Sequence, residues 1–352
     1  MGPGLAIAVN GRPDAELSAA ASVEVYERIG EMTTYSLRCA VDIREGDLPM
    51  LTDGRIGPGA ELSIVARSGE TLACLVKGPV CGQQIRLYHG GLGSSCDVRG
   101  ADSSVAMDRE TKATVWSNVT DSTAVSTIVS TYGFAPDVDS TATTHAETKH
   151  ALVQRESDLR FVRRLARRNG RLFWVTCNPQ GIETAHFKRP SVNGTVAGDL
   201  TINLAAPSVE VVDIAWDVER PTSTTARELD LNTASAIDGS ITGSPLPPLA
   251  SVKFASIVTD ARQVHVTAPV DDAGDLQKRS EAALIDAGFF VRVTCRTTLH
   301  VLGALVRPFT IVNLRGAGRR HSGKYLCAAV RHFIDAAEHR MDLELLRNAW
   351  EV

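Results

Sequence analysis

The chain has 352 residues, of which 43% are hydrophobic and 22% are charged, as in a soluble globular protein with room for two or three domains. A formal net charge of -4 excludes a chain that is polybasic as a whole, which is the usual state of a nucleic-acid binder. No apolar run approaches the length of a transmembrane helix, so we expect no membrane insertion.

The N-terminal third predicts β structure. Residues 35–43 alternate, with Tyr35, Leu37, Cys39 and Val41 on one face, which is the period of a half-buried strand. Further strands are predicted at 61–67, 71–80 and 84–90, separated by Gly, Pro and Asp. Strands at this spacing favour a barrel or sandwich over a βαβ sheet.

Two helices are predicted in the middle of the chain. The first covers residues 121–133, with Asp121 as a plausible N-cap and Gly133 after its last turn. The second begins at Ser157 or Asp158 and ends at Asn169-Gly170.

The second helix carries an unusual density of arginine. Leu159, Val162, Leu165 and Ala166 form its apolar stripe, so the basic side chains occupy the remaining face. Seven arginines lie in and around it: Arg155, Arg160, Arg163, Arg164, Arg167, Arg168 and Arg171. We favour a solvated or subunit-facing surface; an acidic protein partner is the alternative, and nucleic acid is disfavoured because no aromatic residues interleave the arginines. The candidate interface residues are Arg160, Arg163, Arg164 and Arg167.

The last part of the chain predicts strands again, with one helix. A strand is predicted at 209–219, with Val212 and Trp216 on one side, and an extended surface connector at 232–250. The helix covers 275–288 and is capped by Asp275. Strands follow at 289–295, 309–314, 324–333 and 340–347.

Together these elements indicate a β-rich α+β fold. We divide the chain into a first β domain at 1–118, a helix-containing α/β insert at 119–190 and a second β domain at 191–352.

No catalytic, cofactor or metal motif is present, so we expect a protein that is not an enzyme. The glycine-rich residues 89–96 lack the following helix of a phosphate loop. His145 and His150 have no third ligand nearby and are interpreted as surface histidines, and Asp271-Asp272 as capping residues. A thiol–imidazole pair of Cys81 with His89 or His332 has no local support. The seven scattered cysteines form no CxxC pair, and we expect them to be reduced and mostly buried.

The arginine-rich segment resembles the Q-x-x-E-S/T-D motif of the phage late-control-D family, which includes contractile tail hubs and the hub portion of VgrG spikes. The matching residues are Gln154, Glu156, Ser157, Asp158, Phe161, Arg164, Leu165 and Gly170. The C-terminal segment resembles the closing pattern of the family through Gly323, Tyr325, Val330, His332, Arg347 and Asn348. The resemblance runs from about residue 9 to residue 348.

The resemblance implies two β-barrel domains similar to the tail-tube protein, joined by an α/β segment. It also implies a homotrimeric baseplate hub that adapts the six-fold tail tube to a three-fold spike, without a cofactor. The expected partners are the tube protein, a separate spike or tip protein, because no needle repeat follows Asn348, and other baseplate proteins. We expect assembly in the bacterial cytoplasm and then residence in a phage tail or injection particle. The alternatives are a particle-associated cell-wall hydrolase and a receptor-binding tail module.

Overall fold

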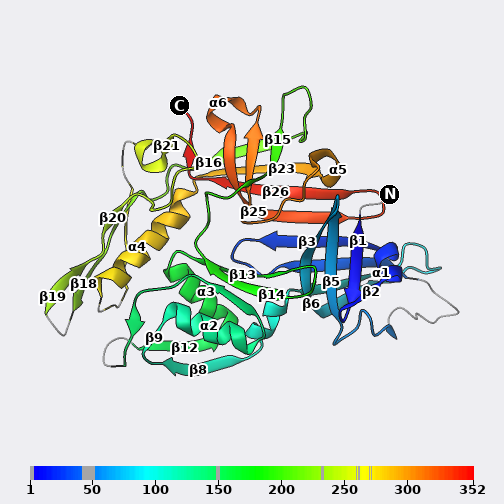
Figure 1. The fold of residues 1–352 in the computed structure, drawn as a ribbon, viewed down its shortest axis with the longest axis horizontal. Helices are drawn as coiled ribbons and strands as arrows, with labels where there is room; N and C mark the ends of the chain where they lie inside the picture. The colour runs from blue at the N-terminus through cyan, green and yellow to red at the C-terminus, as the bar shows by residue number, and fades with distance from the viewer. Residues whose placement is uncertain are drawn as a thin grey trace.

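The structure is a computed structural model, and it describes residues 4–41, 52–147, 151–230, 234–258, 260, 262–268, 270 and 272–352. Two β-rich parts lie against each other, and a helix-containing part packs beside them (Figure 1). The expected class is confirmed: a β-rich α+β fold with two tube-like β-barrel parts joined by an α/β part.

The first β-rich part contains β1 (Leu5–Val9), β2 (Arg12–Asp14), α1 (Ala15–Ala20), β3 (Ala21–Arg28), β4 (Thr34–Ala40), β5 (Glu61–Ser68), β6 (Thr71–Arg86) and β7 (Ser95–Ala101). The long strand β6 changes partner midway, because residues 71–79 pair with β5 and residues 80–86 pair with β7. The sheet therefore folds over a core that includes Ile7, Leu37 and Ile64.

The helix-containing part has its own core. It contains η2 (Ser103–Asp108), β8 (Thr111–Trp116), β9 (Val119–Thr120), α2 (Asp121–Thr131), β10 (Ala135–Val138), β11 (Thr144–His145), β12 (Leu152–Ser157), α3 (Asp158–Arg168), β13 (Leu172–Cys177) and β14 (Glu183–Lys188). Short two- and three-stranded sheets, β12-β8, β11-β9 and β10-β14-β13, surround the two helices. Val125, Phe161 and Phe187 are buried at the centre.

The second β-rich part begins with β15 (Val196–Thr201), β16 (Val212–Trp216), β17 (Ser223–Thr225), β18 (Arg227–Asp230), β19 (Ser235–Asp238), β20 (Ile241–Thr242), β21 (Val252–Lys253), η3 (Phe254–Ser256) and β22 (Gln263–His265). It continues with α4 (Ala273–Gly288), β23 (Val291–Thr298), α5 (Leu299–Leu302), β24 (Ile311–Arg315), α6 (Gly318–His321), β25 (Gly323–Ile334), β26 (His339–Arg347) and β27 (Ala349–Trp350). Strand β26 shows the expected alternation, with Met341, Leu343 and Leu345 buried.

The two β-rich parts are joined by direct strand pairing. β3 and β25 are antiparallel over six residue pairs, from Ala329 opposite Arg28 to Ile334 opposite Val23. The described strands therefore include one 13-stranded sheet that runs from the edge strand β16 through this seam to β2.

Several sequence predictions need correction. Residues 84–90 are not a separate strand, because 84–86 complete β6 and a turn follows. The predicted connector 232–250 contains β19 and β20, which pair with β18 and β17; residues 232–233 lie outside the described part, as do 42–43 of the first predicted strand. The strand predicted at 209–219 is shorter, at 212–216.

Two helix caps also differ from prediction. The N-cap of α2 is Thr120, whose side chain accepts a hydrogen bond from the Thr123 amide, and the N-cap of α4 is Asp272 rather than Asp275. Asp272 therefore confirms the capping interpretation of the 271–272 pair, while Asp271 lies outside the described residues. Among the described helices, none is both long enough and apolar enough to cross a membrane.

Candidate functional site

Three local features define helix α3: an N-cap, a buried apolar stripe and a glycine with positive φ after the last turn. The Ser157 hydroxyl accepts a hydrogen bond from the Arg160 amide at 3.4 Å, which satisfies one of the free amides of the first turn. The predicted stripe is buried, including Leu165. The helix ends before Gly170, whose φ of 62° lies in the left-handed region that glycine adopts without strain.

The motif residue Asp158 organises the start of this helix. One carboxylate oxygen accepts hydrogen bonds from Lys112 Nζ at 2.6 Å and Tyr132 Oη at 2.7 Å, and the other accepts one from Gln154 Nε2 at 2.7 Å. Burial alone would raise the pKa of Asp158, but the donors from these three residues outweigh it and the pKa is lowered. Gln154 also accepts a hydrogen bond from the Trp116 indole. The motif residues Gln154 and Asp158 therefore stabilise the start of helix α3.

The arginines of this segment do not all lie on a solvated surface. The Arg168 side chain is 11% exposed: its Nε donates to Asp121 Oδ2 at 2.7 Å, and its Nη2 contacts Asp121 Oδ1 and His145 Nε2. Asn169 donates to the same carboxylate at 2.6 Å. The expectation of a solvated arginine is therefore wrong for Arg168, and that of a surface histidine is wrong for His145. Asp121 is the centre of a buried network rather than a cap. His150 lies outside the described residues.

The four candidate interface arginines divide into two pairs. Arg160 and Arg164 point outward: Arg160 lies 3.5 Å from Asp108, and Arg164 Nε donates to Glu156 at 2.6 Å. Arg163 and Arg167 instead line a groove, and neither forms an ion pair with any residue that the structure describes. Carboxylates of the same chain therefore neutralise Arg160 and Arg164, whereas Arg163 and Arg167 have no such ion pair among the described residues.

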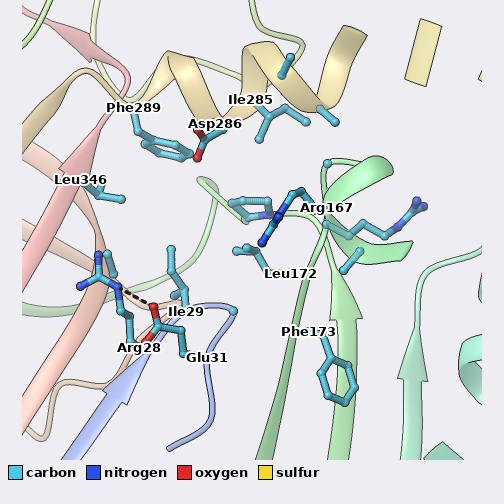
Figure 2. A pocket seen from close by; sticks show the side chains of 18 of the residues that line it. Arg28, Ile29, Glu31, Arg167, Leu172, Phe173, Ile285, Asp286, Phe289 and Leu346 are labelled. Carbon is cyan, nitrogen blue, oxygen red and sulfur yellow. Dashed lines mark ion pairs between the residues drawn. The ribbon is translucent and has the colours of Figure 1, made fainter. Parts of the chain in front are cut away.

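The groove has a volume of about 1310 Å³. It lies between α3, α4, the edge strand β16 and the face of the large sheet, with the turn after β3 at one end. Figure 2 shows Arg167 pointing into it, with Ile285 and Asp286 of α4 opposite and Leu346 of β26 on the sheet side. These walls come from segments far apart in the sequence.

Most of the charged groups in the groove are already paired. Arg28 makes a two-pronged contact with Glu344, at 2.8 and 3.2 Å, and Arg292 lies 3.3 Å from the same carboxylate. Arg220 donates to the carbonyl oxygens at the C-terminal end of α4, at 3.0 Å to Asp286. Arg163 forms no ion pair with a described residue, and its Nε is buried without a hydrogen-bond partner among them. The Arg171 Nε also lacks such a partner, but it lies 3.9 Å from Asp139.

A second buried network lies at the seam between the two β-rich parts. Glu27 of β3 accepts hydrogen bonds from His332 Nε2 at 3.0 Å and from Arg307 Nε at 3.1 Å. Arg307 also donates to the carbonyl oxygens of Cys74 and Leu75. Burial alone would raise the pKa of Glu27. The charge of Arg307 and the contacts with His332 have the larger combined effect, so the pKa is lowered and the carboxylate is ionised at neutral pH.

The other C-terminal motif residues are also structural. Arg347 is almost fully buried over the ring of Tyr325, and its guanidinium is so close to Gly323 that a Cβ there would lie 2.7 Å from Nη2. Asn348 accepts a hydrogen bond from the Leu249 amide at 2.9 Å.

The described residues contain no group of three or more His, Cys, Asp or Glu side chains arranged to hold a metal ion. Of the residues considered for a thiol–imidazole pair, His332 contacts Glu27 and His339, while the exposed Cys81 contacts the carbonyl of Pro79. Six of the seven cysteines are buried, as expected.

The fold is shared along nearly its whole length with tail proteins of known structure. A tail protein from Neisseria meningitidis aligns with a TM-score of 0.69 at 14% identity, covering 99% of this chain and 98% of that one. The 43 kDa tail protein of prophage MuSo2 from Shewanella oneidensis aligns with a TM-score of 0.69 at 15% identity, covering 98% of each chain. An Escherichia coli component of the type VI secretion system aligns with a TM-score of 0.58 at 12% identity, covering 97% of this chain and 76% of that one. No curated protein sequence matches the chain.

The fold class is therefore that of these tail proteins. The chain belongs to the Alg8 N-terminal domain family, whose model matches residues 3–336. This model is not the late-control-D model that the sequence motifs resemble, so the finer family resemblance is not established.

Proposed function

We propose that the protein is a structural component of a tail or baseplate, and that it acts as the hub of a contractile particle. The observation that supports this proposal is the end-to-end fold similarity to two tail proteins, with nothing larger than a short segment left over in either chain.

In the proposed hub, three copies close into a ring of six similar β-barrel parts. The ring connects a six-fold tail tube to a three-fold spike, and the chain acts by assembly rather than by catalysis. A division of the chain at residues 118 and 190 would assign most of the helix-containing part to the insert, although η2 and β8, which precede residue 118, also pack there. Closure would also cover the exposed sheet edge at β2. The particle would be assembled in the bacterial cytoplasm, with the tube, a separate spike and other baseplate proteins as partners.

Electron microscopy and mass photometry of the purified chain, alone and mixed with candidate spike and tube chains, test this proposal. The expected result is a three-fold ring with an axial channel and the mass of three chains. A chain that stays monomeric in every mixture would contradict the hub role and favour a hydrolase or receptor-binding module.

A further inference from the structure

The groove between α3, α4 and β16 contains two arginines that form no ion pair with any residue in the described part of the chain. Arg163 and Arg167 are one helical turn apart and therefore lie on the same face of α3. Neither forms an ion pair with a described residue, whereas Arg160 and Arg164 on the outer face both have carboxylates nearby.

Arg163 is the less satisfied of the two. Burial lowers the pKa of its guanidinium, and its Nε has no hydrogen-bond acceptor among the described residues. Asp102, Glu31 and Asp108 attract this guanidinium without forming an ion pair, so an acceptor from outside the chain would lower the cost of its burial. A carboxylate fits best, since it accepts two donors from a guanidinium.

The rest of the groove suits a polypeptide. Leu172 and Leu346 are half-buried in its lining, and Ile285 lies on the α4 side (Figure 2). The adjoining strand β16 ends the large sheet, and its Trp216 is 52% exposed. A free strand edge offers backbone hydrogen bonds to an extended segment, and apolar pockets beside it can hold alternate side chains.

We propose that this groove binds an extended acidic segment of a partner chain, with carboxylates on Arg163 and Arg167 and an apolar side chain between Leu172 and Leu346. The charge pattern limits the ligand, because Asp286 on the α4 wall has no ion pair with a described residue and would repel a uniformly anionic chain. With only two unpaired arginines, the groove favours an acidic peptide over nucleic acid, which needs a longer row of cations. The inference does not depend on the particle role.

The test is fluorescence anisotropy with a short fluorescein-labelled peptide of alternating leucine and glutamate. We expect saturable binding to the wild-type chain that weakens from about 50 to about 300 mM NaCl, because exposed charge pairs are screened by salt. The R163E/R167E variant should bind at least about tenfold more weakly, while the matched R160E/R164E variant should stay within about twofold of wild type. Asp286→Asn should tighten binding, because it removes the opposing charge.

Circular dichroism and thermal unfolding check the fold of each variant. If R163E/R167E does not fold, Arg167→Glu alone replaces it, because Arg167 is exposed. No binding of the peptide to folded wild type, or equal losses in the two double variants, would overturn the proposal. Tighter binding of a single-stranded oligonucleotide than of the peptide would overturn it in favour of a phosphate ligand. A failed peptide test would leave the ring measurement unaffected.

Discussion

The carboxylate of Asp121 contacts three side chains from two segments of the chain. It contacts His145 of β11, Arg168 at the end of α3 and the Asn169 side chain that follows. Burial would raise the pKa of Asp121, yet these contacts lower it below its ordinary value. The stabilisation is therefore present at pH values above the unfolded-state pKa near 3.8 and is lost as the pH falls through the lower folded-state pKa.

Asp121→Asn should destabilise the protein strongly, because it leaves the largely buried Arg168 without a full negative charge. We expect a loss of about 3 kcal/mol in the free energy of unfolding, measured by urea denaturation at pH 7. The matched control is Asp97→Asn, which breaks the pair with the exposed Arg38 and should cost less than about 1 kcal/mol. Equal losses in the two variants would refute a special role for the buried network.

At the scale of elements, Gly170 allows α3 to approach α4. Its φ is 62°, and a Cβ there would lie 2.8 Å from Ile285 Cδ1 and 3.1 Å from Ala282 Cα. Gly133, after α2, has a similar φ of 79° but open space around it. Both positions would strain a residue that carries a Cβ, and they differ in packing.

Gly170→Ala should therefore destabilise more than Gly133→Ala. Left-handed strain costs both variants about 1 to 2 kcal/mol, and the clash with α4 should add at least about 1 kcal/mol to the first. Thermal or urea unfolding of the two variants measures the difference. Equal destabilisation would mean that α4 moves aside without cost, and the close contact would then have no energetic importance.

Local patterns in the sequence predict local structure well here. The stripe around Leu165 and the alternation in β26 both follow from the side-chain period, and the structure buries the expected faces. Caps are harder to place, because neighbouring residues such as Asp272 and Asp275 offer equivalent oxygens. The change of partner midway along β6 leaves no mark on the side-chain period, so it could not be predicted.

The groove could not be predicted from one segment. Arg163 and Arg167 were found as part of an arginine-rich helix, but what separates them from Arg160 and Arg164 is the position of α4 and β16. That position depends on tertiary packing across more than 40 residues of sequence. The same holds for Glu27 and Arg307, which lie far apart in sequence and meet in one buried contact.

At the scale of the whole molecule, the two β-rich parts are joined at one seam, where β3 pairs with β25. The β3–β25 pairing continues the sheet across it, and the network of Glu27, Arg307 and His332 is buried beneath. Arg307 also ties this network to the backbone of β6. Since the two halves share both backbone and side-chain contacts, acid sensitivity at the seam should affect the stability of the whole chain.

His339 extends this network and should make folding sensitive to mild acid. Its Nε2 lies 3.0 Å from His332 Nδ1, and burial together with the charge of His332 lowers the pKa of His339 to about 3. Above the unfolded value of 6.5 His339 is neutral in both states and its depressed pKa has no effect on stability, whereas the folded state is increasingly destabilised as the pH falls from 6.5 towards 3, because only the unfolded chain takes up the proton. At pH 5 the loss from this residue should reach about 2 kcal/mol, because one pKa unit corresponds to about 1.4 kcal/mol.

Urea unfolding of wild type and His339→Gln between about pH 7.5 and about pH 5 isolates this contribution, since carboxylates titrate mainly below that range. The variant should be less stable than wild type at the upper end, because it loses packing and a hydrogen bond within the seam. The difference should shrink steadily towards pH 5, because glutamine takes up no proton there. A difference that stays constant with pH would show that His339 is equally protonated in the folded and unfolded chains, and the buried histidine pair would then have no part in the response of the seam to acid.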